Sequence, residues 1–457
     1  MEMARLSSVY ADFIRGTSYE KLPAEVVLQV KERVLDLIGV CLAGYKLMEF
    51  PQRVVNYMAS LGGTPEATII AQKNRKFPAI NAALANGSCA HALDMDDGHR
   101  FAASHPGATL IPAAIATAEM CAASTKDLIA GVVAGYEIFI RVGMAINPSN
   151  LSRGFHSTGV VGPFGAVAAA ANIMKLNLDE TIGALGLAGL QGAGLLQVTH
   201  DDEAAKVKSL HTAKGAMEGL FSAILAREGT RGPVAILEGQ DGFLRAMADD
   251  VNKDLLIRDL GRKFEIGNAY TKFYAACRHV HVSVDAALSI GHREQINPDE
   301  ISSINVETYP IALNLCGTVH PATPSAARFS LPFSVALALI KGDASAEKYS
   351  DENIKDERIQ SLAGKVQLSV GDKWEKLYPA KRGATVSITD TRGKTGSTEM
   401  ELAKGEPDNP ASREDISRKF HTNATLLISE KAAKELEDTI MNLEDMSMAK
   451  FAKLLET

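Results

Sequence analysis

Apolar residues recur at helical spacing along much of the first half of the chain. Between residues 26 and 41, valine, leucine and isoleucine lie three or four positions apart, Pro23 precedes them and Gly44 follows them. A proline in the first turn and a glycine just past the end are typical of an α-helix. Similar patterns predict three more helices, at residues 81–92, 111–122 and 128–144.

Alanine and glycine dominate residues 155–227, as in the segments GAVAAAANIM and GALGLAGLQGAGLL. Small side chains allow helix backbones to approach closely, so this part is expected to form tightly packed central helices. Because glycine lowers helix propensity, the stability of these helices must come from their packing.

The pattern changes near residue 269. Apolar and polar residues alternate in three segments, which predicts half-buried strands at residues 302–309, 366–370 and 384–389. Helical patterns lie between them at residues 281–293 and 332–341, and helical patterns return after residue 405.

These segments together predict a mainly α-helical protein of two domains. We expect a large all-helical domain over residues 1–268 and an inserted α+β domain over residues 269–405. Residues 406–457 are expected to return to the helical domain, which would then be built from both ends of the chain.

Composition agrees with this prediction and excludes several classes of protein. The 457 residues are too many for one ordinary core, and 46% of them are hydrophobic, which is a normal globular balance. The net charge of -7, without a dense Lys/Arg run, argues against binding to nucleic acid. The most apolar stretches, residues 128–146 and 159–174, contain Glu137, Arg141 or Pro163, so we expect buried core helices and no membrane span.

Several sequence patterns are missing, and each absence narrows the function. The chain begins without a signal-peptide pattern, and none of its five cysteines forms a CxxC pair, which indicates reduced thiols in the cytoplasm. Without CxxC pairs or HExxH, we predict no metal site. Neither GxGxxG after a strand nor GxxxxGK[ST] occurs, so no nucleotide cofactor is expected.

The densest group of polar residues lies at residues 86–105 (NGSCAHALDMDDGHRFAASH), between two helical patterns. It contains His91, Asp94, Asp96, Asp97, His99, Arg100 and His105. Ionisable groups at the edge of a core suit a pocket with tuned proton donors. A solvated loop whose aspartates cap the next helix would show the same pattern, and these residues alone leave both interpretations open.

Two smaller clusters follow. Residues 153–159 (RGFHSTG) could present backbone N–H groups to a carboxylate, although plain N-capping by Ser157 or Thr158 is the commoner outcome. Lys208 and His211 are three residues apart, so on a helix they would share a face. A lysine and a histidine together suit an anionic substrate, but a solvated basic face is again the commoner outcome.

A fourth cluster, residues 272–281 (KFYAACRHVH), opens the predicted α+β domain. Ligand sites favour domain boundaries, so its two cations and two histidines are candidates for a binding site. The two histidines could suggest a metal, but no partner ligand stands at metal spacing.

In their order and separation, the four clusters resemble the MmgE/PrpD family, which includes 2-methylcitrate dehydratase, cis-aconitate decarboxylase and iminodisuccinate epimerase. The most specific segment is HALDMDDGHR, which is similar to the family signature H-x-x-D-x-D-D-T-H. The segments GFHSTGVVG, KSLHTAKGA, KFYAACRHVH and FSLPFSVA extend the similarity along nearly the whole chain.

The resemblance implies an all-helical domain with an α+β lid, a homodimer, no cofactor and a pocket between the two domains. By matched position it assigns catalytic roles to Asp94, His105, His156, Lys208 and Lys272. Further substrate contacts are expected from His99, Arg100, His211, Cys277, Arg278 and His281.

The five matched residues are expected to divide the work as follows. Lys208 and Lys272 should bind substrate carboxylates from opposite sides of the cleft. His105 and His156 should transfer protons, with Asp94 positioning or tuning one of them. Asp96 and Asp97 are expected to be structural and to bond backbone N–H groups of the loop.

Two residues depart from the family pattern. Gly98 stands where many members have threonine, which removes a hydroxyl contact. Cys277 stands where the decarboxylases have a histidine, and His279 or His281 could compensate.

The reaction implied by the resemblance is proton abstraction next to a carboxylate of a small di- or tricarboxylate. The first hypothesis is a hydro-lyase similar to 2-methylcitrate dehydratase. Alternatives are an epimerase of a succinate-like acid and a decarboxylase of cis-aconitate. A non-catalytic binding protein ranks last, because His105, His156, Lys208 and Lys272 are all present.

Overall fold

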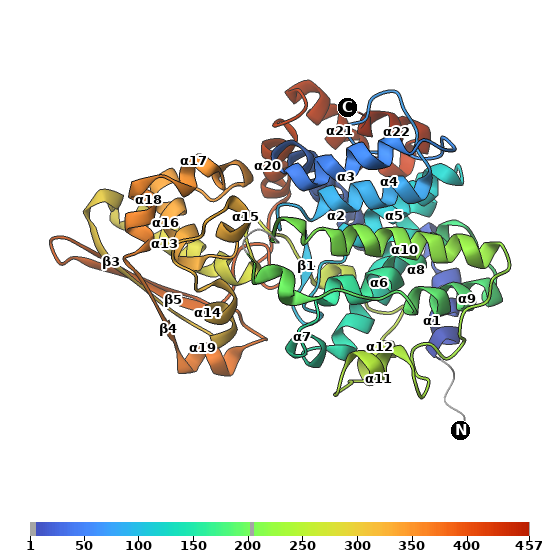
Figure 1. Ribbon diagram of the computed structural model, residues 1–457, viewed down its shortest axis with the longest axis horizontal. Helices are drawn as coiled ribbons and strands as arrows, with labels where there is room; N and C mark the ends of the chain where they lie inside the picture. Colours follow the sequence, from blue (N-terminus) through green and yellow to red (C-terminus); the bar gives the residue numbers. More distant parts are fainter. Residues whose placement is uncertain (1–5, 202–204, 457) are drawn as a thin grey trace.

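The computed structural model describes residues 6–201 and 205–456. Its larger part is a body of helices in which α8 (Ser157–Ile173) lies at the centre (Figure 1). The helix α8 packs against α5 (Gly107–Met120), α6 (Thr125–Ile146), α9 (Leu178–Gly189) and α10 (Leu210–Arg227). The helices α2 (Ala24–Leu47) and α4 (Ala79–Ala90) complete the inner layer.

Close packing explains why so many alanines and glycines occur in these helices. The helices α6 and α8 approach so closely at Gly135 that a Cβ atom there would lie 2.9 Å from the carbonyl oxygen of Gly165. Every residue of α8 is buried, which is unusual for a surface helix and typical of a core helix. The expectation of tightly packed central helices is therefore confirmed.

The smaller part contains a four-stranded sheet in the order β4-β3-β5-β6. Its strands are β3 (Ile301–Thr308), β4 (Val366–Val370), β5 (Ala384–Asp390) and β6 (Thr395–Met400). The pair β3 and β4 is parallel, and the other two pairs are antiparallel. The helix α13 (Arg278–Glu294) packs on the sheet and against α16 (Leu331–Lys341), so one face of the sheet is covered (Figure 1).

The last helices of the chain pack on the helical body. They are α20 (Arg413–Ala424), α21 (Glu430–Met441) and α22 (Met448–Leu455). Both α20 and α21 contact α2, and α22 contacts α5. The hydrophobic core of the body accordingly contains Phe420 and Phe451 as well as residues of the first helices.

The remaining elements are short or peripheral. The helices are α1 (Leu6–Gly16), α3 (Glu49–Ser60), α7 (Ser149–Ser152), α11 (Phe243–Met247), α12 (Asp254–Ile257), α14 (Pro310–Cys316), α15 (Pro324–Ala327), α17 (Asp351–Ile354), α18 (Glu357–Ala363) and α19 (Asp372–Leu377). Two short strands, β1 (Gly98–His99) and β2 (Ala269–Tyr270), pair antiparallel. This pairing ties the polar segment at residues 86–105 to the start of the smaller part.

The mainly helical fold class with a small sheet is confirmed. Within the described residues, one helix, Thr125–Ile146, is long and apolar enough to cross a membrane by length and composition alone. Its apolar window is completely buried inside the protein, as a core helix is.

Candidate active site

The segment between α4 and α5 is held in place by Asp97. Its carboxylate accepts hydrogen bonds from the backbone N–H of Gly107 at 3.0 Å and from the hydroxyl of Tyr136 at 2.7 Å. Asp97 therefore has the structural role expected of it, at the start of α5. Asp94, in the same segment, has a φ of 51°, a left-handed conformation that aspartate tolerates better than most residues.

Asp94 lies between two lysines that are far apart in the sequence. The Nζ atom of Lys272 is 2.7 Å from Asp94 Oδ1 and donates a second bond, also of 2.7 Å, to the Asp94 carbonyl oxygen. The Nζ atom of Lys208 is 3.4 Å from Asp94 Oδ2. Burial alone would raise the pKa of Asp94, but the two ammonium groups outweigh it and hold that pKa well below its usual range.

His105 is fixed as one particular tautomer. Its Nδ1 lies 2.8 Å from the carbonyl oxygen of Asp97, which can only accept, so the neutral ring carries its hydrogen on Nδ1. The other nitrogen, Nε2, is left with a lone pair and lies 3.9 Å from Asp94 Oδ1. Burial, followed by the charge of Lys272, lowers the pKa of His105 well below its usual value, so the ring is neutral at neutral pH.

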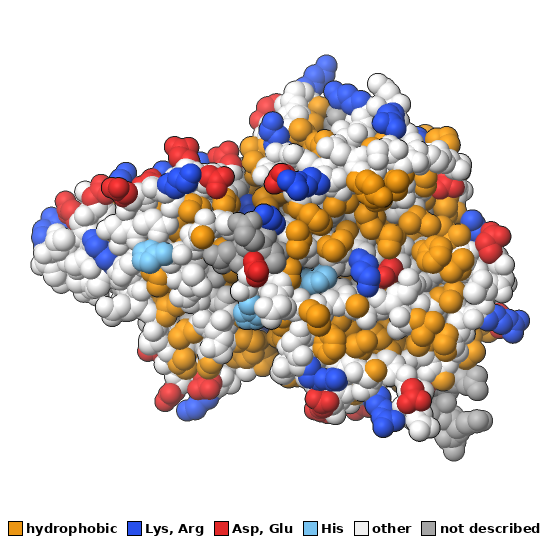
Figure 2. Space-filling model, in the orientation of Figure 1, with side chains coloured by type: hydrophobic (Ala, Val, Ile, Leu, Met, Phe, Trp, Pro, Cys, Tyr) orange, Lys and Arg blue, Asp and Glu red, His pale blue; other side chains and the backbone are white. Residues whose placement is uncertain are grey.

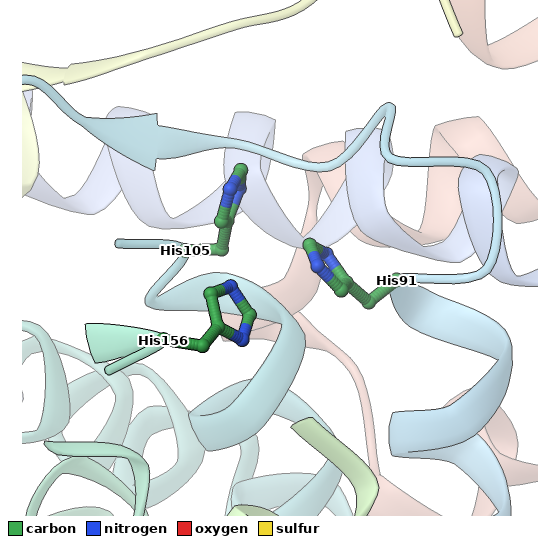
Figure 3. A group of neighbouring side chains, drawn as sticks. All are labelled: His91, His105 and His156. Atoms are coloured by element: carbon green, nitrogen blue, oxygen red, sulfur yellow. The ribbon is translucent and has the colours of Figure 1, made fainter. Parts of the chain in front are cut away.

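His156 begins α8 and faces His105, with 6.4 Å between the two ring centroids (Figure 3). Its Nδ1 is 2.9 Å from Nδ1 of His211, so one ring must donate the hydrogen that the other accepts. Burial and Lys208 lower the pKa of His156 well below its usual value, and burial lowers that of His211 to about 4. His211 is half-buried behind His156 and is thus a partner of His156.

A third histidine, His91, completes the group in Figure 3 and had no predicted role. Its Nδ1 lies 2.8 and 2.9 Å from the two oxygens of Asp96, and both side chains are fully buried. Its Nε2 is buried without a hydrogen-bond partner among the described residues and the ring lies 4.7 Å from that of His105. The expectation that Asp96 bonds backbone N–H groups is therefore corrected, because its carboxylate faces the imidazole of His91 and lies 3.5 Å from Nδ1 of His105.

These groups border a cavity of about 90 Å³ between the helical body and the smaller part. Asp94, His105, His156 and Lys208 line it from the body, and Lys272, Cys277, Arg278 and His279 line it from the beginning of the smaller part. The rest of the wall is formed by Ala103, Leu151, Leu196, Thr199, Tyr270, Leu315, Phe329, Tyr378 and Arg382. This volume is below that of pockets for drug-sized ligands, so the cavity admits only a small molecule.

Besides His211, three residues predicted to contact substrate lie outside this lining because other groups hold them. His99 Nδ1 accepts a bond from the backbone N–H of Ala102. Arg100 borders a neighbouring cavity and binds the carbonyl oxygen of Ala380 and the carboxylate of Asp408. His281 bonds the carbonyl oxygen of Ala276 and the Arg278 guanidinium, so the geometry gives none of the three a substrate contact.

Of the two departures from the family pattern, Cys277 lines this cavity and Gly98 lies behind the wall residue Tyr270. Of the two histidines that could compensate for Cys277, only His279 lines the wall, and its Nδ1 is 2.7 Å from the hydroxyl of Tyr309. A hydrogen bond with Cys316 lowers the pKa of the Cys277 thiol to about 7. Gly98 lies directly under Tyr270, whose ring fills the space that a Cβ atom would need.

The same residues could in principle surround a metal ion. Ligand atoms of His91, His105 and His156 lie within 4.8 Å of one another, as do those of His91, Asp94, Asp96 and His105. Sequence spacing does not reveal this grouping, because α8 brings His156 beside the earlier segment. Lys208 and Lys272 also lie against Asp94, and their charges would oppose a cation there.

Sequence reasoning named His279 as a candidate but missed Tyr270 and Arg382 as wall residues and the His91–Asp96 pair behind the wall. His91 stands in the signature segment and was visible as part of its polar cluster. The pairing of β1 with β2 places Tyr270 at the wall, and nothing local to Arg382 marks it as a pocket residue.

Comparison with known proteins identifies the family of the chain. The family models of the MmgE/PrpD N-terminal domain and the MmgE/PrpD C-terminal domain match residues 9–256 and 274–445. Cis-aconitate decarboxylase of Homo sapiens is 25% identical over 461 residues, which cover 98% of this chain and 93% of the human protein. Cis-aconitate decarboxylase of Aspergillus terreus is 24% identical over 451 residues, or 94% of this chain and 91% of that protein. 2-Methylcitrate dehydratase of Cupriavidus necator is 24% identical over 243 residues, or 50% of this chain and 48% of that protein. With both family models matched along most of its length, the chain belongs to the MmgE/PrpD family.

Proposed function

We propose that the protein is a cofactor-independent lyase that removes a proton next to a carboxylate of a small di- or tricarboxylic acid. The observation that carries this proposal is the contact of two buried lysines with one aspartate, beside two buried neutral histidines. The relatives named above are decarboxylases and a dehydratase, which are lyases of polycarboxylates.

The lysines supply the charge that this chemistry needs. Lys208 and Lys272 together carry two positive charges against the one negative charge of Asp94, so one positive charge remains for a substrate carboxylate. When a proton leaves the neighbouring carbon, negative charge spreads onto that carboxylate. Ammonium groups already in place stabilise this charge without having to reorganise, which lowers the barrier.

The histidines divide into a base and an acid. His105 suits the base, because the bond from Nδ1 to the Asp97 carbonyl leaves a lone pair on Nε2. His156 suits the acid when His211 donates the hydrogen bond between their Nδ1 atoms, because the ring hydrogen of His156 then lies on Nε2, from where it can protonate a departing hydroxyl. A substrate lying between the two rings would meet the base on one side and the acid on the other.

For the finer reaction we propose a hydro-lyase similar to 2-methylcitrate dehydratase. Decarboxylation is the second candidate, because relatives named cis-aconitate decarboxylase match over nearly the whole chain. Epimerisation of a succinate-like acid is the third, and a non-catalytic binding protein is the last. A dehydratase and an epimerase would use the same base, whereas in a decarboxylase the carboxylate leaves as carbon dioxide and a histidine protonates the carbon. All three reactions would use the same lysines.

A panel of citrate, 2-methylcitrate, cis-aconitate and aspartate-derived acids tests these alternatives. A hydro-lyase forms an alkene that absorbs in the ultraviolet, a decarboxylase releases carbon dioxide, and an epimerase exchanges solvent deuterium into recovered substrate without forming an alkene. If no acid of the panel is altered by any of these measures, the proposal of a lyase is wrong.

Three further features belong to this proposal. The part formed by residues 269–405 would act as a lid over the cavity, the chain would act in the cytoplasm, and it would form a homodimer through the helical body. In support of a dimer, Figure 2 shows hydrophobic side chains gathered on one face of the body. Leu190 and Leu195 are 64% and 59% exposed, and Leu210 and Phe221 are also exposed on or next to α10. A monomeric mass in light scattering at micromolar concentration would contradict the dimer.

A further inference from the structure

Arg278 and Arg382 lie over the ring of Tyr270, and Arg100 is joined to Arg382 through its carbonyl oxygen. The three arginines differ in their partners. Arg278 forms an ion pair of 3.0 Å with Glu406, and Arg100 lies 3.3 Å from Asp408. Arg382 is only 7% exposed, yet no carboxylate among the described residues lies within ion-pair distance of its guanidinium.

Arg382 also has spare hydrogen-bond donors. One Nη atom donates to the carbonyl oxygen of Arg100 at 2.9 Å, and the Nε atom is buried without a partner in the described chain. A guanidinium has five N–H donors, and a buried charge without a counter-charge is costly unless a ligand supplies one. Arg382 lines the cavity, so a ligand there can reach it.

The charged side chains of the wall leave two positive charges without a counter-charge, at two separate places. At the first place, Lys208 and Lys272 carry two positive charges and Asp94 carries one negative charge, so one positive charge remains. Arg278 is balanced by Glu406, which leaves Arg382 as the second unmatched charge. Two fixed positive charges in one small cavity match an acid that has two carboxylates at a fixed separation.

Contacts with Tyr270 and with the carbonyl oxygen of Arg100 keep the Arg382 guanidinium in this position. The guanidinium carbon lies 5.8 Å from the centre of the Tyr270 ring, over the ring face, where a cation is attracted. Tyr270 is paired with Gly98 in the β1–β2 ladder, and only the absence of a side chain at Gly98 leaves room for the ring. Arg382 is therefore positioned by its contacts before a ligand arrives.

We propose that Arg382 binds a second carboxylate of the substrate, one that does not react, while Lys208 and Lys272 hold the carboxylate next to the carbon that loses its proton. Guanidinium and carboxylate match in shape and can form two parallel hydrogen bonds, which fixes orientation as well as charge. The substrate class is then an acid with at least two carboxylates, and monocarboxylic acids are excluded. The assignment of reacting and non-reacting ends rests on the proposed lyase function.

The test compares ligands that differ in their carboxylates, by calorimetric titration of the purified full chain. Butanoate has one carboxylate, succinate has two and propane-1,2,3-tricarboxylate has three. Succinate should bind the parent protein at least about 10-fold more tightly than butanoate, because it alone can reach both charges. In Arg382→Gln the affinity for succinate should fall by about 10- to 100-fold, with butanoate changed by less than about 3-fold.

Two further variants keep this test decisive. Lys381→Met removes a neighbouring charge whose partner is Glu401 outside the cavity, and it should bind all three acids as the parent does. Arg382→Lys keeps the charge but loses the paired geometry, so it should retain part of the preference for succinate even if Arg382→Gln does not fold.

The inference is overturned if Arg382→Gln weakens butanoate and succinate equally or leaves both unchanged, or if Arg382→Lys prefers succinate as strongly as the parent. The outcome is independent of turnover. If succinate binds through Arg382 but no acid of the substrate panel reacts, the carboxylate site stands and the proposed lyase function fails.

Discussion

Lys272 offers a way to separate stability from catalysis within one ion pair. Its ammonium group is completely buried and donates to both a carboxylate oxygen and the carbonyl oxygen of Asp94, each at 2.7 Å. Lys272→Met removes both bonds while filling a similar volume. Breaking a buried ion pair by removing one partner typically costs about 3–5 kcal/mol of the free energy of unfolding.

The lower end of that range is expected here. Lys208 stays 3.4 Å from the other oxygen of Asp94, so the carboxylate keeps one counter-charge and we expect a loss of about 3 kcal/mol. Asp94→Asn and Lys272→Met each break the same Asp94–Lys272 ion pair, which the double variant can lose only once. The double variant should therefore be more stable than the sum of the two single losses predicts, by at least about 1 kcal/mol.

Turnover should respond differently. Without Lys272 the charge that develops on the substrate carboxylate loses one donor, and kcat should fall by about 100- to 1000-fold. Asp94→Asn cannot restore that donor, so kcat of the double variant should not rise above that of Lys272→Met, although its loss of stability is smaller than the sum of the single losses. Urea unfolding followed by circular dichroism gives the first quantity, and steady-state kinetics on the substrate found in the panel gives the second.

A second buried ion pair provides the control. Arg141 and Glu137 form a pair of 3.1 Å inside α6, away from the cavity, with both side chains at most 1% exposed. Arg141→Met should also lower stability by a few kcal/mol, while its folded fraction keeps near-parental kcat. The reasoning is refuted if Lys272→Met turns over at close to the parent rate, or if the stability losses of the single variants simply add.

The remaining predictions concern the histidines and metal. His105→Ala and His156→Ala should each lower kcat by at least about 100-fold, the usual effect of losing a general acid or base, and near-parental turnover in either would exclude that residue. Burial holds the pKa of His99 at about 3 and those of His105, His156 and His279 well below 6.5. The unfolded chain therefore binds more protons below pH 6.5, so stability is complete above that pH and falls below it. The expected loss is about 1.4 kcal/mol per pH unit for each such histidine, measured as a falling urea midpoint. Dialysis against EDTA should leave kcat unchanged, and activity that is lost to the chelator and restored by one metal would contradict this.

Elements with strong periodicity could be predicted from the sequence, and elements without it could not. The strand β3 alternates buried and exposed residues over Ile301–Thr308, and it lies where the pattern at residues 302–309 placed it. The strand β6, Thr395–Met400, was missed because its sequence TGSTEM offers almost no apolar residue to show alternation. Its pairing with β5 supplies the stability that its own composition does not.

Some contacts of the site could likewise be predicted from the sequence, and others could not. Residues of the signature segment could be assigned because they lie together in the sequence. The contact of Lys208 and Lys272 with the same carboxylate could not, because it depends on how α10 and β2 meet the segment between α4 and α5. For the same reason the carboxylate closest to the histidines proved to be Asp96, which bonds His91, while Asp94 bonds a lysine most closely.

At Gly98 the departure from the family motif goes together with a second residue, Tyr270, which occupies the space that a threonine side chain would need. Many members are expected to have threonine at this position, but here a Cβ atom would collide with the hydroxyl and ring of Tyr270. A hydroxyl is thus present at the same place, supplied by the residue that pairs with Gly98 across the β1–β2 ladder. Restoring the motif should therefore harm the enzyme.

Gly98→Thr would push the Tyr270 ring away and with it the support of Arg382. We expect Gly98→Thr to bind succinate about 10-fold more weakly than the parent, because the second carboxylate loses its fixed partner. Adding Tyr270→Ser makes room for the threonine, so the double variant should have a higher urea midpoint than Gly98→Thr alone. Its affinity for succinate should stay as low as in Gly98→Thr. If Gly98→Thr binds succinate or turns over substrate better than the parent, the threonine hydroxyl matters more than the position of Tyr270, and this account of the glycine is wrong.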